Sequence, residues 1–115
     1  MEKNPQMAKL VQELKKSSIE QGVGIWKRVA EDLEKPSRKR REVNIYLIDR
    51  IAKDGETLVV PGKVLGTGEL GKKVKVAALN FSDSAYSKIK AKGEALTLLE
   101  LMKKNPKGKD VRILG

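Results

Sequence analysis

A chain of 115 residues can form one compact core but is too short for two ordinary domains, so we expect a single domain over residues 1–115. The 25 Lys and Arg residues outnumber the 15 Asp and Glu residues, and the net charge of +10 favours a polyanionic partner, above all nucleic acid. Cys and His are both absent, which excludes disulfides, the usual zinc sites and imidazole catalysis. Most catalytic chemistries therefore lack a required residue, and no metal site is expected. An enzyme is disfavoured, although the composition would still permit carboxylate pairs or a Ser/Lys nucleophile.

Membrane insertion is not expected from the hydropathy pattern. No apolar run approaches the roughly 20 residues that span a bilayer, and the N-terminus lacks the apolar core of a signal peptide. The sequence predicts a soluble cytoplasmic protein.

The first third of the chain has helical periodicity. Asn4 and Pro5 suit a helix start, and one apolar stripe follows at Met7, Leu10, Val11 and Leu14. The glycines at 22 and 24 interrupt the pattern, and a second stripe ends before Pro36; it consists of Trp26, Val29, Ala30 and Leu33. These patterns predict a helical hairpin over residues 1–35.

A basic segment follows the hairpin. The run KPSRKRR at 35–41 contains no apolar residue that could enter a core, so residues 36–42 are expected to form an exposed basic connector. After it, Val43, Leu47, Ile48 and Ile51 suit a helix that Asn44 could cap. The alternation of Val43, Ile45 and Leu47 also fits a strand, and we favour the helix.

Residues 43–115 are expected to form a compact mixed α/β unit. Asp54 and Gly55 indicate a turn, and strands are predicted at 57–60 and 73–77. The glycines at 62, 66, 68 and 71 are expected to supply the turns between these strands, as in a hairpin.

Two further helices and a last strand are predicted near the C-terminus. Ser82 can cap one helix, with Phe81 and Tyr86 as its hydrophobic staple and Gly93 at its end. Thr97 and Glu100 match a capping box for a helix that ends near Asn105, and residues 111–113 suit a strand. The predicted fold class is α/β, with the helical hairpin preceding the mixed unit.

The glycine-rich segment resembles a nucleotide-binding loop only in its spacing. Gly66, Gly68 and Gly71 satisfy G-x-G-x-x-G, but Lys73 stands where a Walker loop needs a hydroxyl. Both nucleotide motifs also require a helix after the glycines, and here a strand pattern follows. A nucleotide or other small-molecule site is therefore disfavoured.

The few aromatic residues favour recognition of phosphate and shape over base stacking. The spacing of Trp26 within its apolar stripe makes packing the favoured role, with stacking on an unpaired base as the alternative. Tyr46, Phe81 and Tyr86 are scattered along the chain and are mostly assigned to the core.

Two groups of cations are candidate RNA contacts. The first basic group consists of Lys35, Arg38, Lys39, Arg40 and Arg41. Its concentration of arginines favours phosphate binding over a solvated charge run or a nuclear-import signal. The second basic group consists of Lys63, Lys72, Lys73 and Lys75 around the glycine-rich segment, accompanied by Lys88, Lys90 and Lys92 on the helix predicted after Ser82. Lys88 and Lys92 share a helix face and could either follow an RNA backbone or face solvent.

Three segments together resemble one family. WKRVAEDLEKPSRKRREVN, VVPGKVLGTGELGKKVKVAALNFS and SAYSKIKAKGEAL are similar to the archaeal and eukaryotic large-subunit ribosomal protein family called eighteen-e. The most specific element is VPGKVLGTG at 60–68, and the compact length resembles that of archaeal members.

This resemblance implies a fold shared with the C-terminal part of ribosomal protein fifteen, an irregular superhelix of strand, strand and helix. It also implies binding to large-subunit ribosomal RNA, with neighbouring ribosomal proteins as further partners and with no catalysis and no cofactor. The family's basic stretch corresponds to Arg38–Arg41, and its glycine-rich signature corresponds to Pro61, Gly62, Lys63, Gly66 and Gly68. We expect a structural constituent of the large subunit; a free-standing structured-RNA-binding protein or RNA-processing cofactor is the alternative.

Overall fold

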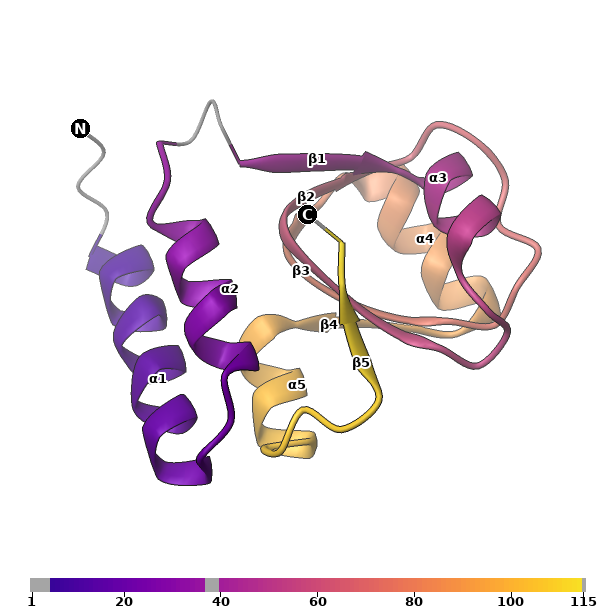
Figure 1. Ribbon diagram of the computed structural model, residues 1–115. Helices are drawn as coiled ribbons and strands as arrows, with labels where there is room; N and C mark the ends of the chain where they lie inside the picture. The colour runs from indigo at the N-terminus through magenta and orange to yellow at the C-terminus, as the bar shows by residue number, and fades with distance from the viewer. Residues whose placement is uncertain (1–4, 37–39, 115) are drawn as a thin grey trace.

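The computed structural model describes residues 5–36 and 40–114, which contain five helices and five strands (Figure 1). In chain order the elements are α1 (Pro5–Gln21), α2 (Ile25–Leu33), β1 (Arg41–Asn44), α3 (Ile45–Ile51), β2 (Thr57–Leu65), β3 (Lys75–Phe81), α4 (Asp83–Lys92), β4 (Glu94–Thr97), α5 (Leu98–Lys104) and β5 (Val111–Ile113). The predicted α/β class, with a helical hairpin leading into a mixed unit, is confirmed. None of the helices in the described ranges is long and apolar enough to cross a membrane.

The helical hairpin, α1 and α2, forms because two apolar stripes face the same core. Gly22, with φ at +65°, reverses the chain between the helices in a backbone region that favours glycine. The second stripe is fully buried at Trp26, Val29, Ala30 and Leu33. Trp26 also donates its Nε1–H to the carbonyl oxygen of Pro106 at 2.7 Å, so its buried ring is hydrogen-bonded as well as packed. The favoured packing role of Trp26 is confirmed.

The five strands form one parallel sheet with the order β1-β2-β3-β4, and β5 pairs with the first half of β2. Alternate residues of the central strands face two different cores. Val59, Ala77 and Leu96 pack with α1, α2 and α5, whereas Leu58, Val60, Val76 and Ala78 pack with α3 and α4. Burial on both faces explains why β2 reads as a continuous apolar run.

The predicted hairpin between the two central strands is wrong. β2 and β3 are parallel, and residues 66–74 connect them without a helix. β2 also continues past the predicted end, so Gly62 lies inside this strand, at the register shift between Val60 and Lys63. Alternating apolar residues and glycines indicate strands and breaks, but they do not indicate strand direction.

The region after the basic segment also differs from the prediction. Arg41 and Glu42, assigned to the connector, begin β1, and Val43 belongs to that strand rather than to a helix. Val43 pairs with Val64 and is buried, and this tertiary pairing outweighs the local helical pattern. The helix does follow, as α3, with Asn44 at its N-cap but without a side-chain capping bond. β4 was not predicted at all.

The helix caps after the sheet strands are as expected. Ser82 Oγ accepts from the Ala85 N–H at 3.2 Å, and the rings of Phe81 and Tyr86 meet edge to face at 6.0 Å. Thr97 and Glu100 form the predicted capping box at the start of α5. Gly93 ends α4 with φ at −166° and ψ at −128°, not in the left-handed conformation common at helix ends, and a Cβ there would overlap the carbonyl oxygen of Val74.

Candidate nucleic-acid interface

The first basic group is partly tied to the end of the helical hairpin. Lys35 is exposed and pairs with Asp32 at 3.1 Å, while the half-buried Arg40 donates its Nε–H to the Leu33 carbonyl oxygen at 3.2 Å. Arg41 is exposed as the first residue of β1. Arg38 and Lys39 lie outside the described residues. Arg40, which directly precedes β1, therefore also connects the start of this strand to the end of α2.

A signature glycine explains how Arg41 is placed. Arg41 pairs with Gly62 across β1 and β2, and a Cβ at Gly62 would overlap the Arg41 carbonyl oxygen. The two backbones can approach this closely only because position 62 lacks a side chain. Gly62 thus fixes the start of β1, and Arg41 with it, against the sheet.

The second basic group is divided by the fold. Lys63 is exposed on β2, beside Glu42 of β1 and beside Asn80 near the end of β3. Lys75, by contrast, is the first residue of β3. Lys63 therefore lies closer to the strand that carries Arg41 than to the other three lysines with which it was grouped.

The remaining members of the second group lie where β2, β3 and β4 begin. Lys72 donates its Nζ–H to the Ala52 carbonyl oxygen at 2.7 Å, whereas Lys73 and Lys75 are exposed. Lys73 and Lys75 line a depression of about 230 Å³ together with Lys92 and Glu94. Lys92 thus joins this group.

Glu94 is the acidic residue of this depression and is already paired. Lys104 Nζ donates to its carboxylate at 2.6 Å, and this bond holds the pKa of the Glu94 carboxyl below its ordinary value, with Lys75 acting in the same direction. Glu94 therefore stays ionised at neutral pH.

Lys88 was expected either to follow an RNA backbone or to face solvent, and the structure shows a different role. Its Nζ donates to the carbonyl oxygens of Gly66 and Gly68 at 2.7 and 2.6 Å, and Glu69 lies 3.8 Å away. The ammonium group satisfies two carbonyl groups of the glycine-rich connection. Lys88 thus shapes residues 66–68 and is separated in function from Lys92.

The glycine-rich connection does not have the geometry of a phosphate loop. It leads into β3, as expected from the strand pattern, so it is not followed by the helix whose N-terminus binds phosphate in nucleotide-binding loops. Gly68, with φ at +107°, lies against the backbone of Tyr46, and Gly66 lies against Ser84. These glycines permit close packing on α3 and α4.

The exposed aromatic residues were not identified from the sequence. Tyr46 and Tyr86 are 51% and 44% exposed, so their assignment to the core is wrong.

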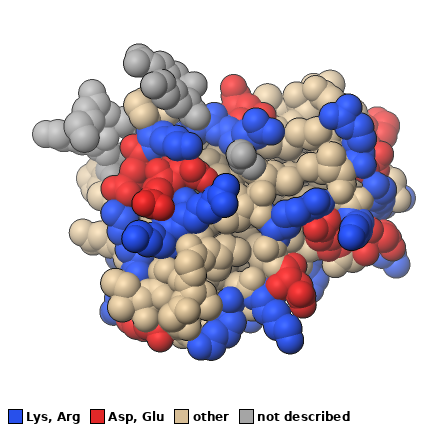
Figure 2. Space-filling model, in the orientation of Figure 1, with Lys and Arg blue, Asp and Glu red and all other residues tan. Residues whose placement is uncertain are grey.

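Within the described residues, no three acidic side chains are placed to hold a metal ion. Figure 2 shows the Lys and Arg side chains of one face in several separate groups, with acidic side chains between them.

Comparison with known proteins decides the family. Residues 24–97 match a family whose description names the ribosomal proteins 50S-L15 and 50S-L18e together with a 60S counterpart. The large ribosomal subunit protein eL18 of Methanoregula boonei is 52% identical over 96% of this chain and 93% of its own length. This chain belongs to the eL18 family.

Two further eL18 proteins agree with this membership. The protein of Methanococcus maripaludis is 48% identical over 100% of this chain and 97% of its own length. The protein of Haloarcula marismortui is 47% identical over 96% of each chain. All three relatives are archaeal, as the compact eL18-like length suggested.

Proposed function

We propose that this chain is a structural constituent of the large ribosomal subunit that binds and stabilises folded large-subunit ribosomal RNA through phosphate contacts. The observation that carries the proposal is the 52% identity over 96% of the chain with a large ribosomal subunit protein. As a member of this family the chain is located on the cytoplasmic ribosome. Its effect is thermodynamic and involves no turnover, and the whole chain acts as one RNA-binding domain.

The charge distribution supports phosphate binding. The net charge of +10 attracts RNA, and each Lys or Arg that neutralises a phosphate releases condensed counterions. The proposed contacts are Lys35, Arg38, Lys39, Arg40, Arg41, Lys63, Lys72, Lys73 and Lys75. Because Lys63 and Arg41 lie apart from Lys73 and Lys75, the protein presents cations in more than one place. Separate groups suit a scaffold between RNA helices that repel each other.

The deciding variant replaces Arg38, Lys39, Arg40 and Arg41 together with Ala. Each lost phosphate contact lowers the slope of log affinity against log salt by about 0.7 to 0.9. If most of the four side chains contact phosphates, the slope should therefore fall by about 2 to 3.5. Binding to transcribed large-subunit ribosomal RNA is measured across a salt series. Melting by circular dichroism should show only a modest loss, because the Arg40 bond to Leu33 contributes about 1 kcal/mol.

A matched variant removes the same charge from the helical hairpin. It replaces Lys9, Lys15, Lys16 and Lys27, none of which belongs to the proposed contacts. We expect a much smaller change in the salt slope than in the first variant. Equal slopes for the two variants would show that RNA responds to net charge alone and not to the first basic group.

Ribosome fractionation tests the biological setting. The protein should co-sediment with large subunits after a high-salt wash, since many phosphate contacts are made at once. Recovery only in the unbound fraction would favour a free-standing binder of structured RNA.

A further inference from the structure

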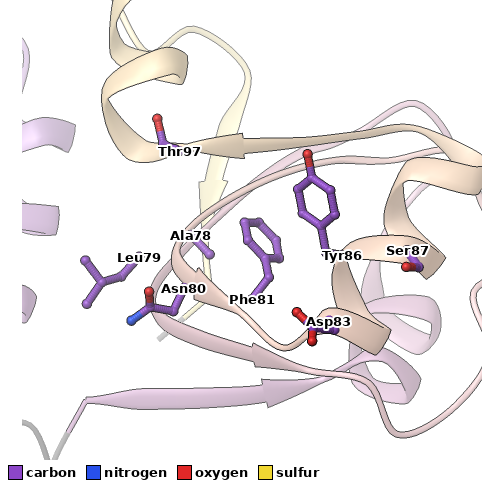
Figure 3. A pocket seen from close by; sticks show the side chains of 8 residues that line it. All are labelled: Ala78, Leu79, Asn80, Phe81, Asp83, Tyr86, Ser87 and Thr97. Carbon is purple, nitrogen blue, oxygen red and sulfur yellow. The ribbon is translucent and has the colours of Figure 1, made fainter.

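A groove of about 390 Å³ lies where β3 ends and α4 begins (Figure 3). The residues lining it belong to neither basic group and include Ala78, Asn80, Phe81, Asp83, Tyr86 and Thr97. In Figure 3 the rings of Phe81 and Tyr86 lie next to each other, and Ala78 lies between Asn80 and Thr97. The groove therefore combines an aromatic wall with polar side chains.

Tyr86 offers an oriented aromatic surface. Its side chain is 44% exposed, and its ring meets that of Phe81 edge to face, with centroids 6.0 Å apart and planes at 73°. Phe81 and Tyr86 flank the Ser82 cap of α4, so the start of this helix fixes both rings. An exposed ring held in one orientation can stack a base without losing much side-chain entropy on binding.

The polar side chains of the groove match the edge of a base. The Asn80 amide both donates and accepts hydrogen bonds, and the Asp83 carboxylate accepts them. Thr97 Oγ1 accepts the Glu100 N–H at 3.1 Å, which leaves its own hydroxyl hydrogen to donate. Nucleobase edges carry both donors and acceptors, whereas an apolar protein side chain would bury these groups without partners.

Cations lie beside the groove rather than inside it. Lys90 Nζ lies over one face of the Tyr86 ring, 5.4 Å from its centroid, so a base would stack on the opposite face or displace this flexible side chain. The backbone of Lys63 in β2 pairs with that of Asn80. Asp83 disfavours a phosphate within the groove itself, because two anions would lie close together. This arrangement suits a base in the groove, with the flanking phosphates near the lysines.

We propose that this groove binds one unpaired nucleobase, which stacks on Tyr86 while the groove's polar side chains contact its edge. The inference rests on the proposed function, because the base belongs to the ribosomal RNA. It adds base stacking to a surface that otherwise recognises phosphate. The site was missed from the sequence because Tyr86 was assigned to the core.

A titration of the isotope-labelled full chain tests the groove directly. AMP, CMP, GMP and UMP are added separately and followed by amide NMR, with ribose 5-phosphate as the matched probe without a base. At least one nucleotide should shift the signals of Asn80, Phe81 and Tyr86 in a saturable way, and ribose 5-phosphate should not. Absence of such shifts, or equal shifts with ribose 5-phosphate, would overturn the proposal.

Substitutions connect the groove with RNA affinity. Tyr86→Leu keeps apolar contact with Phe81 but removes the aromatic face, and Tyr86→Phe keeps the ring. Loss of a base–aromatic stack lowers affinity by about 5- to 150-fold. We expect a loss in this range for Tyr86→Leu on transcribed large-subunit ribosomal RNA, with an unchanged salt slope, and near-parent affinity for Tyr86→Phe. Affinities are compared at a temperature at which melting shows every variant folded.

The comparable exposed tyrosine supplies the control. Tyr46→Leu removes a ring that is 51% exposed but does not line the groove, so its RNA affinity should stay near that of the parent. Equal losses for Tyr46→Leu and Tyr86→Leu would overturn the assignment to this groove. If Tyr86→Leu weakens retention on salt-washed subunits but not affinity for RNA, the groove holds a protein side chain and the proposal is wrong. In these outcomes parent binding to RNA persists, so the proposed function stands.

Discussion

The two faces of the sheet are packed by different means. On one face, α1, α2 and α5 place large side chains, with Trp26 among them, against Val59, Ala77 and Leu96. On the other face, α3 and α4 cover a core that also takes Leu70 and Val74 from the connection between β2 and β3. Here the backbone approaches its neighbours closely, and glycines occupy the tightest positions. We expect stability to depend on side-chain volume on the first face and on the absence of Cβ atoms on the second.

Truncation of the largest side chain should have the largest effect. Trp26 is fully buried, and Trp26→Ala should lower the free energy of unfolding by about 3 to 5 kcal/mol, as large core truncations do. Trp26→Phe keeps an aromatic ring but loses the bond to Pro106, so its cost should be smaller. Urea unfolding measures both. If Trp26→Ala unfolds at the same urea concentration as the parent, the first face does not depend on side-chain volume as we expect.

On the second face, addition of a single methyl group to a glycine should lower the free energy of unfolding. Gly93→Ala places a Cβ on the Val74 carbonyl oxygen, and relief of this overlap should cost about 1 to 3 kcal/mol. Gly24→Ala is the matched control, because a Cβ there meets nothing within 4 Å and its φ is −86°. Its effect should stay within about 0.5 kcal/mol, since the poorer N-cap and the stiffer unfolded chain oppose each other. Equal stabilities for the two variants would show that the strand yields easily.

Whether an element could be predicted from the sequence depends on how local its signals are. The helical hairpin was predicted because its signals are local: two apolar stripes at helical spacing and the glycines between them. β1 and β4 were missed because each has four residues and depends on a partner distant in the chain. Val43, for example, becomes a strand residue only through Val64.

The candidate site shows the same limit. The positions of the lysines along the sequence indicated that Lys63, Lys73 and Lys75 are exposed. They did not indicate that the fold separates Lys63 from the other two. They also could not show that Lys88 binds the carbonyl oxygens of Gly66 and Gly68, because those partners lie about twenty residues earlier. A charge pattern predicts that a side chain reaches the surface, not which backbone group it meets there.

The N-caps of two helices, one on each face of the sheet, should have smaller effects on stability. Thr97 caps α5 through the Glu100 N–H, so Thr97→Ala should cost about 1 kcal/mol. Asn44 holds the same position before α3 but makes no side-chain capping bond, so Asn44→Ala should cost only a few tenths. Thermal melting of the two variants measures the difference. A larger loss for Asn44→Ala would mean that its side chain stabilises the second face in another way.

The smallest effect on stability is expected from a pH-dependent ion pair between Glu94 of β4 and Lys104 of α5. This pair lies on the first face of the sheet, with the helical hairpin. The hydrogen bond from Lys104 lowers the pKa of Glu94, and the same bond raises the pKa of Lys104. A carboxyl with a lowered pKa in the folded state contributes stability above its unfolded pKa and loses it as the pH falls through the folded pKa. A lysine with a raised pKa contributes below its unfolded pKa and loses this contribution as the pH rises through the folded value.

Lys104→Met should therefore be slightly less stable than the parent across the neutral range, and the difference should disappear at both extremes. On the acid side it should start to fall below roughly pH 4.3, the ordinary pKa of Glu. Lys103→Met is the matched control, because it removes the same charge from the last turn of α5. Urea unfolding is measured from acid to alkaline pH, with a parallel series in 1 M salt. The difference should shrink in salt because Lys104 is largely exposed and Glu94 is partly exposed. A difference that persists unchanged in strong acid would assign the effect of Lys104 to packing of its aliphatic stem and not to its charge.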